Sequence, residues 1–285
     1  MTYDVAIIGT GPAGLSAALN LKLHNKSILW FGSADLSLKV GKSEKIANYP
    51  GFSLVKGSEL NAAFQKQIEE ASLEITDKMV TMIAPSGDEF MILGDNDIFN
   101  AKSILLATGS FTGKSMPGED ELLGMGVSYC ATCDGFLYKE KTIGVYCSAK
   151  RYEHEVEYLA ELADQVYLWA PYKECEINLP NVEKLESPMT EILGEGRVKG
   201  IRQKDDSRKE VDGVFLLRSS VAPTKLINGL EMDGAHILVD RKMATNIAGV
   251  YAAGDCTGRP YQITKATGEG NVAAHSILDY LASLA

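Results

Sequence analysis

The chain has 285 residues, of which 45% are hydrophobic and 23% charged, and its formal net charge is −10. This balance is typical of a soluble globular protein with room for two modest domains. The negative charge argues against nucleic acid or an anionic membrane as a partner. No apolar run approaches the ~18 residues that span a bilayer, and the first strand follows Met1 without a signal-peptide pattern, so we expect a cytoplasmic protein.

Hydrophobic periodicity predicts alternating strands and helices along the whole chain. Two stretches have the strand–helix–strand order of a βαβ unit, and residues 113–118 have the composition of a linker. The predicted strands cover residues 4–8, 27–31, 80–84, 89–93, 103–107, 141–146, 165–170 and 249–253, with further short strands within 185–218. The predicted helices cover residues 13–24, 58–72, 152–163 and 270–284.

This order of elements indicates an α/β protein with two nucleotide-binding, Rossmann-like domains, the second inserted into the first. We expect the first domain to consist of residues 1–112 and 241–285, and the inserted domain to consist of residues 113–240.

The turn of the first βαβ unit has the sequence GTGPAG at residues 9–14. In such a turn Gly9 allows the tight bend, Gly11 lets the backbone approach a pyrophosphate, and Gly14 lets helix and strand pack closely. We therefore expect a dinucleotide at the N-terminus of the following helix. The acidic residue that usually follows the second strand is missing, and Asp35 is the nearest candidate.

The second βαβ unit lacks these glycines. When its strands are aligned with those of the first unit, Tyr146, Ser148 and Arg151 stand opposite the three glycines. Side chains then occupy the space that a pyrophosphate needs. The sequence predicts that this second unit does not bind a nucleotide.

Cys130 and Cys133 form a CxxC pair, which Asp134 follows directly. Such a pair is either a redox-active dithiol or half of a zinc site. The sequence has no second pair and no clustered histidines, which favours redox chemistry and no metal. One thiol must react as the thiolate, and Asp134 is placed to exchange its proton. The remaining cysteines are expected to be structural: Cys147, Cys175 and Cys256.

Together these motifs resemble the low-molecular-weight flavin thioredoxin reductases along nearly the whole chain. The hexapeptide CATCDG at 130–135 matches the active-site motif of that family without change. The resemblance implies FAD as cofactor, thioredoxin as partner, a homodimer, and catalytic roles for Cys130, Cys133 and Asp134. It also implies the following FAD-binding residues: Gly9, Gly11, Pro12, Ala13, Gly14, Asn48, Thr108, Gly109, Gly254, Asp255, Gln262 and Ile263.

The chain departs from the NADPH-using members at two places. They carry a glycine-rich turn where this chain has YCS at 146–148, and a His-Arg-Arg run where it has APY at 170–172. In this respect the chain is similar to the ferredoxin-dependent branch, which implies that electrons pass from reduced ferredoxin through FAD and the cysteine pair to thioredoxin. Three alternatives stay open: an NADPH-dependent thioredoxin reductase with an atypical nucleotide site, a flavin disulfide oxidoreductase with another donor or acceptor, and a flavin-bound scaffold without turnover.

A local basic stretch contains Lys39, Lys42 and Lys45. Ferredoxins are typically acidic, and a protein with a net charge of −10 needs a local cationic surface to attract one. We hypothesise that ferredoxin docks on these three lysines.

Overall fold

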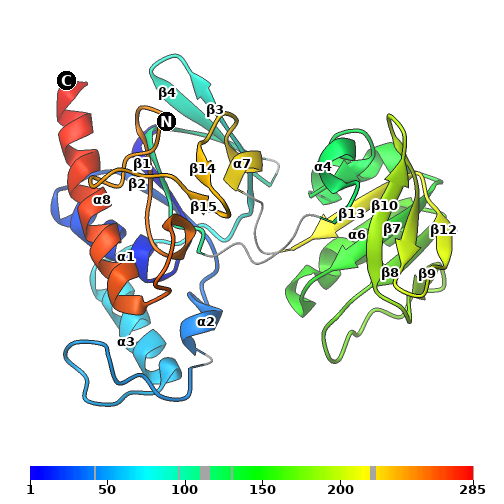
Figure 1. The fold of residues 1–285 in the computed structure, drawn as a ribbon, viewed down its shortest axis with the longest axis horizontal. Helices are drawn as coiled ribbons and strands as arrows, with labels where there is room; N and C mark the ends of the chain where they lie inside the picture. The colour runs from blue at the N-terminus through cyan, green and yellow to red at the C-terminus, as the bar shows by residue number, and fades with distance from the viewer. Residues whose placement is uncertain (42, 96, 110–115, 130, 219–222, 285) are drawn as a thin grey trace. The chain divides into compact units, whose positions relative to one another are not determined.

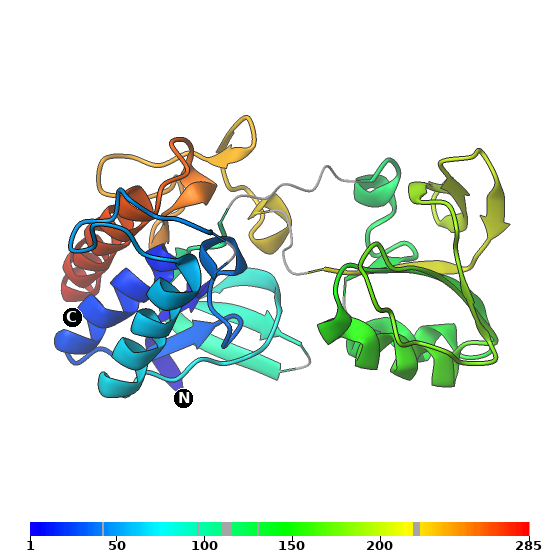
Figure 2. The same cartoon turned by 90° about the horizontal axis from the view of Figure 1, so that it is seen from below.

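The computed structural model describes residues 1–41, 43–95, 97–109, 116–129, 131–218 and 223–284, apart from the side chains of Leu38 and Cys133. The chain divides into two compact units. Unit 1 comprises Met1–Phe111 and Ala222–Ala285, and unit 2 comprises Thr112–Val221. Figures 1 and 2 show that each unit has its own sheet and its own helices.

Unit 1 is built on a mixed six-stranded sheet. Its strands are β1 (Thr2–Ile8), β2 (Ile28–Phe31), β3 (Val80–Ser86), β4 (Glu89–Gly94), β5 (Asp97–Leu106) and β16 (Val250–Ala252). The order is β2-β1-β5-β4-β3, and β16 pairs with the last part of β5. Strands β1, β2, β5 and β16 are parallel, so their carboxyl ends lie at the same edge of the sheet.

The helices of unit 1 include a closely packed pair, α1 and α8, which lie side by side in both views (Figures 1 and 2). The helical segments are α1 (Pro12–Leu23), α2 (Leu38–Gly41), α3 (Gly57–Glu70), α7 (Pro223–Leu226), the 3-10 turn η3 (Asp255–Thr257) and α8 (Ile263–Ser283). We predicted that the last helix begins at residue 270, but it begins at Ile263. Gly270 lies inside this helix, and only glycine fits there because a Cβ would be 2.1 Å from the carbonyl oxygen of Ala13.

The compact units divide at a different place from the expected second domain boundary, which lay between residues 240 and 241. The division lies between Val221 and Ala222, so residues 223–240 belong to unit 1. Helix α7 packs against β3, and Ile227 forms a β-bridge with Ile83. The segment ends in a small hairpin, β14 (Met232–Asp233) and β15 (His236–Ile237). These long-range contacts leave no signal in the local sequence pattern.

Unit 2 contains a parallel sheet and an antiparallel sheet. The parallel strands are β6 (Val127–Ser128), β7 (Thr142–Cys147), β8 (Gln165–Trp169), β9 (Val182–Lys184) and β13 (Gly213–Leu217), in the order β6-β13-β7-β8-β9. The antiparallel strands are β10 (Met189–Gly194), β11 (Val198–Gln203) and β12 (Arg208–Glu210). The helical segments are α4 (Glu119–Leu122), α5 (Ala131–Asp134), η1 (Gly135–Tyr138), η2 (Lys150–Tyr152) and α6 (Glu153–Leu162).

Alternation along β7 shows how the layers of unit 2 are arranged. Ile143 and Val145 belong to a buried cluster with Val156 of α6. Gly144 points to the other face, where the side chain of Ile201 in β11 lies 3.4 Å from the position of a Cβ. The parallel sheet of unit 2 therefore lies between helix α6 and the antiparallel sheet. Among the described ranges, no helix combines the length and the apolar character needed to cross a bilayer.

Candidate functional site

The glycine-rich turn of unit 1 brings the ends of β1 and β5 into close contact. Gly9 has φ +119°, and a Cβ there would be 2.2 Å from the carbonyl oxygen of Ala107. A Cβ at Gly14 would be 2.0 Å from the carbonyl oxygen of Gly9, which accepts a hydrogen bond from the Trp30 indole at 2.9 Å. Gly9 and Gly14 are therefore required by the packing of the turn itself.

Gly11 has a different role. A Cβ at Gly11 would meet no heavy atom within 4 Å, so open space lies beside the first turn of α1. Backbone N–H groups in the first turn of a helix have no partner within the helix, and the partial positive charge there attracts anions. Pro12, which has no N–H, begins the helix. This arrangement leaves a cradle that fits a phosphate group.

Two further segments that the sequence singled out meet this turn in unit 1, and two others meet each other. Gly254 follows β16 with φ +90°, and a Cβ there would be 3.0 Å from the Cβ of Ala13. Thr108 directly follows Ala107, whose carbonyl is in contact with Gly9. Asn48 donates a side-chain hydrogen bond to Gln262, the residue before α8, at 2.6 Å. The glycine-rich turn, Thr108 and Gly254 thus lie together at the carboxyl edge of the parallel strands, where open α/β sheets bind ligands.

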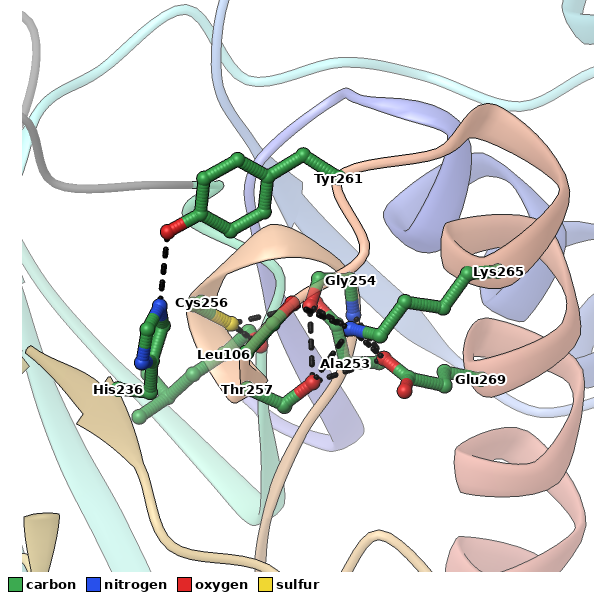
Figure 3. Close-up of polar contacts among 10 residues, drawn as sticks. Leu106, His236, Ala253, Gly254, Cys256, Thr257, Tyr261, Lys265 and Glu269 are labelled. Carbon is green, nitrogen blue, oxygen red and sulfur yellow. Dashed lines mark hydrogen bonds and ion pairs between the residues drawn. The ribbon is translucent and has the colours of Figure 1, made fainter. Parts of the chain in front are cut away.

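A polar network that we did not predict holds the loop after β16 (Figure 3). The ammonium group of Lys265 donates to the carbonyl oxygens of Gly254 and Gly258, both at 2.9 Å, and forms an ion pair with Glu269 at 3.0 Å. Glu269 in turn accepts the Gly254 N–H at 2.8 Å. The two side chains are 17% and 19% exposed. In the sequence the only signal was a Lys–Glu pair four residues apart.

Asp255 and Lys39 form an ion pair, with Nζ 2.8 Å from Oδ2, although they are far apart in the sequence. The Lys39 ammonium also lies 5.0 Å from the centroid of the Tyr261 ring. Tyr261 is hydrogen-bonded to His236 at 2.8 Å, as Figure 3 shows. Lys39 is therefore part of the Asp255 site, which weakens its assignment to a docking surface. Lys45 is exposed, and Lys42 lies outside the described residues.

Strand pairing in unit 2 changes the expected alignment of the two turns by one residue. Ile8 pairs with Phe31 in unit 1, and Tyr146 pairs with Trp169 in unit 2. Tyr146 is therefore a strand residue whose ring packs on Trp169, at 4.9 Å between centroids. In this alignment Cys147, Ala149 and Tyr152 take the places of the three glycines of unit 1. The turn in unit 2 therefore still has no glycine.

The N-terminus of α6 in unit 2 carries an anion of its own. The carboxylate of Glu153, the first residue of this helix, accepts a hydrogen bond from the Tyr172 hydroxyl at 2.7 Å and from the Glu176 N–H at 3.1 Å. Despite some burial, these hydrogen bonds hold the pKa of Glu153 below its ordinary value. A negative charge at this position repels the phosphate groups that the helix N-terminus would otherwise attract. No local sequence pattern connects Tyr172 with Glu153, which lies 19 residues earlier in the chain.

The redox motif lies in unit 2. Asp134 ends α5, and its Oδ2 accepts a hydrogen bond from the Ser128 hydroxyl at 2.6 Å. Cys130 and the side chain of Cys133 lie outside the described part of the chain. Gly135 and the segment η1 follow at once, where Phe136 and Leu137 are 62% and 52% exposed.

The other cysteines are free thiols. Burial raises the pKa of the Cys256 thiol to about 11, and this thiol donates to the carbonyl oxygens of Leu106 and Ala253. Burial also raises the pKa of the Cys147 thiol, which lies 3.5 Å from the Tyr172 hydroxyl. Buried, protonated thiols are poor nucleophiles. Among the described residues, no group of three or more His, Cys, Asp or Glu side chains is arranged to bind a metal ion.

Comparison with known proteins agrees with this architecture. Residues 3–158 and 177–270 match the family described as pyridine nucleotide-disulphide oxidoreductase. The thioredoxin reductase of Aquifex aeolicus is 33% identical over 274 residues, which cover 89% of this chain and 85% of that protein. A crystal structure of a ferredoxin-flavin thioredoxin reductase from Clostridium acetobutylicum is 43% identical, with a TM-score of 0.94, and covers 100% of this chain and 99% of that one. A thioredoxin reductase structure from Gloeobacter violaceus is 29% identical, with a TM-score of 0.83, and covers 99% and 95%.

These matches confirm the predicted family, the α/β fold with Rossmann-like units, and FAD as the cofactor. The chain belongs to the pyridine nucleotide-disulphide oxidoreductase family and is an FAD-binding disulfide reductase of the thioredoxin reductase type.

Proposed function

We propose that the chain passes electrons from reduced ferredoxin, through FAD and the Cys130–Cys133 disulfide, to thioredoxin in the cytoplasm. The observation that carries this proposal is the contrast between the two helix N-termini. The first turn of α1 is open, whereas α6 begins with the carboxylate of Glu153, held by Tyr172. The likeness to the ferredoxin-flavin thioredoxin reductase of Clostridium acetobutylicum supports the assignment of ferredoxin as the donor.

FAD would be held at the carboxyl edge of the sheet in unit 1. The pyrophosphate would lie on the turn formed by Gly9, Gly11, Pro12, Ala13 and Gly14, where the free N–H groups of α1 point. The remaining part of the cofactor would contact the neighbouring segments: Asn48, Thr108, Gly109, Gly254, Asp255, Gln262 and Ile263. Bound FAD supplies a group that accepts electrons singly and delivers them in pairs to a disulfide.

The cysteine pair carries the electrons to thioredoxin. The thiolate of one cysteine attacks the thioredoxin disulfide and forms a mixed disulfide, and the second cysteine then displaces the reduced thioredoxin. One enzyme disulfide forms, one thioredoxin disulfide is broken, and two protons end on thioredoxin. Asp134 lies within the motif and is held by Ser128, so its carboxylate is fixed in position to exchange a proton with a thiol.

The energetics favour this direction of transfer. Plant-type ferredoxins have reduction potentials of about −400 mV and thioredoxin of about −270 mV. Electron transfer from ferredoxin to thioredoxin is therefore favourable by ~0.13 V per electron. A ferredoxin therefore replaces a nicotinamide as the donor without an energetic penalty.

An apolar surface in unit 2 fits a protein disulfide substrate. Met125, Phe136 and Leu137 are 54%, 62% and 52% exposed, and two of them follow the redox motif directly. Met125 and Leu137 also line a cavity of about 420 Å³ together with Lys141 and Arg197. Exposed apolar side chains that lie together, as Met125 and Leu137 do at this cavity, mark protein interaction sites, and Phe136 is the neighbour of Leu137 in the chain. We assign this surface to thioredoxin.

The donor proposal predicts a specific response of the flavin in anaerobic titrations. Reduced ferredoxin bleaches the flavin absorbance, and NADPH does not, because Glu153 and Tyr172 close the second nucleotide site. Absorbance at the flavin maximum is recorded after each addition. Fast bleaching by NADPH would identify an atypical NADPH-dependent reductase, and bleaching by neither reductant would point to another donor.

Two glycine substitutions should separate cofactor binding from folding. Gly11 has φ −72°, which alanine adopts readily, so Gly11→Ala should leave the unfolding of the cofactor-free protein unchanged and weaken FAD binding by about tenfold or more. Gly14→Ala should lower the free energy of unfolding by about 1–3 kcal/mol, because its Cβ overlaps a carbonyl oxygen.

FAD affinity is measured by fluorescence titration and stability by thermal unfolding. Gly268→Ala is the matched control, because Gly268 lies in α8 and also has nothing within 4 Å of a Cβ. If Gly11→Ala binds FAD as tightly as the wild type does, the pyrophosphate does not lie at the proposed position.

The apolar surface predicts an effect confined to thioredoxin. Phe136→Ser should raise KM for thioredoxin by about thirtyfold, since loss of an aromatic side chain that becomes buried in an interface costs about 2 kcal/mol. The rate of flavin reduction by ferredoxin should stay unchanged. Ile98→Ser, at an apolar position in β5 that is 64% exposed, is the control. An unchanged KM for Phe136→Ser would show that thioredoxin binds elsewhere.

We propose that Lys45, which is exposed, contributes to the ferredoxin docking surface, and this predicts an effect confined to ferredoxin. Lys45→Glu should slow flavin reduction by ferredoxin and flatten its dependence on salt, because long-range attraction accelerates encounter with an acidic partner. Stopped-flow rates over a salt series measure both quantities. Lys66→Glu, which reverses the charge of an exposed lysine on α3, is the control. Identical salt slopes for the two variants would contradict docking at Lys45.

A further inference from the structure

Three side chains from separate segments of unit 2 meet next to the redox motif. Oε1 of Glu119, the first residue of α4, accepts hydrogen bonds from the Tyr129 hydroxyl at 2.6 Å and from the Arg218 guanidinium. Its Oε2 accepts the Met116 N–H at 2.8 Å. The Arg218 guanidinium also lies over the Tyr129 ring, 5.3 Å from its centroid. We call Glu119, Tyr129 and Arg218 the Glu119 triad.

Burial makes the geometry of the triad strict. The side chain of Glu119 is 1% exposed and that of Arg218 13%. A carboxylate removed from water needs a paired charge and hydrogen-bond donors on its oxygens, and Glu119 has both. Burial, together with the hydrogen bond to Glu119, raises the pKa of Tyr129, so its hydroxyl stays protonated and remains a donor. Loss of any member leaves the others with unsatisfied groups.

The triad joins the residue before the cysteine pair to segments near the beginning and the end of unit 2. Tyr129 is the residue before Cys130. Glu119 lies shortly after the point where the chain enters unit 2, and Arg218 shortly before the point where it leaves. Strand β6, which ends at Ser128, pairs with β13, which ends just before Arg218. None of these three residues belongs to the motifs that define the cofactor site or the cysteine pair.

We infer that the Glu119 triad is a positioning device for the redox disulfide. It fixes Tyr129, the residue before Cys130, to Glu119 near the beginning of unit 2 and to Arg218 near its end. On the same segment Ser128 holds Asp134. The triad acts through Tyr129. This inference rests on the proposed role of Cys130 and Cys133 as the redox pair.

The expected consequence concerns the equilibrium between disulfide and dithiol. Reduction of the disulfide adds two electrons and two protons and breaks the S–S bond, and the reverse reaction is favoured when both thiols are held close together. Release of Tyr129 allows the first cysteine to move away from the second, which lowers the effective concentration of one thiol toward the other. Variants of the triad should therefore have a disulfide that is easier to reduce.

The experiment uses full-length, FAD-loaded protein equilibrated anaerobically in dithiothreitol redox buffers. The fraction of Cys130–Cys133 dithiol is read by acid quenching, alkylation and mass spectrometry. Arg218→Met should shift the equilibrium about tenfold toward the dithiol, which is about 30 mV. Tyr129→Phe, which keeps the ring and removes one hydrogen bond, should shift it about threefold in the same direction.

Arg202→Met is the matched control. Arg202 pairs with Glu191 at 2.9 Å between β11 and β10 of the antiparallel sheet and takes no part in the triad contacts described above, so its replacement should leave the equilibrium at the wild-type value. The same dithiol fraction in Tyr129→Phe, Arg218→Met and Arg202→Met at each buffer ratio would overturn the inference, whatever the thermal stabilities of these variants. If Arg218→Met does not fold, Tyr129→Phe decides. A wild-type protein without a reversible dithiol couple would instead overturn the proposed function.

Discussion

The attraction between a helix N-terminus and an anion is the interaction on which the rest of this structure depends. Both units place a helical segment after a parallel strand, α1 in unit 1 and η2 followed by α6 in unit 2. The start of such a segment carries a partial positive charge that attracts anions. In unit 1 the glycines keep side chains away, and the first turn of α1 is open to a phosphate. In unit 2 Glu153 provides the negative charge, and Tyr172 holds it there. This contrast underlies the proposal that FAD binds at the first turn of α1 and that a donor other than a nicotinamide supplies the electrons.

Two ion pairs that are largely buried stabilise the conformation of loops in the two units. In unit 1 Lys265 and Glu269 bind the backbone around Gly254, and in unit 2 Glu119 and Arg218 hold the residue before the cysteine pair. Removal of one partner of a buried pair costs about 3–5 kcal/mol, whereas exposed pairs contribute about 0–1 kcal/mol. Apolar packing fixes the sheets, but these loops contain few apolar side chains. Charge pairs with several hydrogen bonds give them a single geometry.

The sequence was sufficient for features that depend on neighbouring residues. The glycine spacing at 9–14, the apolar strands and the CxxC pair each have a local cause, so the fold class, the family and FAD could be predicted. Contacts between distant segments could not. Residues 223–240 join unit 1 through Ile227 and Ile83, and Lys39 reaches Asp255 across more than half of the chain. Glu153 looked like an ordinary residue in the first turn of a helix until the structure placed Tyr172 beside it.

The stoichiometry of a reconstituted anaerobic reaction tests the central claim most directly. The enzyme, thioredoxin and a measured amount of reduced ferredoxin are mixed without nucleotide, and the thiols of thioredoxin are then counted by alkylation. The account predicts one thioredoxin dithiol for every two ferredoxins oxidised, with no product when Cys133 is replaced by serine. Thioredoxin that becomes reduced only after NADPH is added, with ferredoxin left unoxidised, would contradict it.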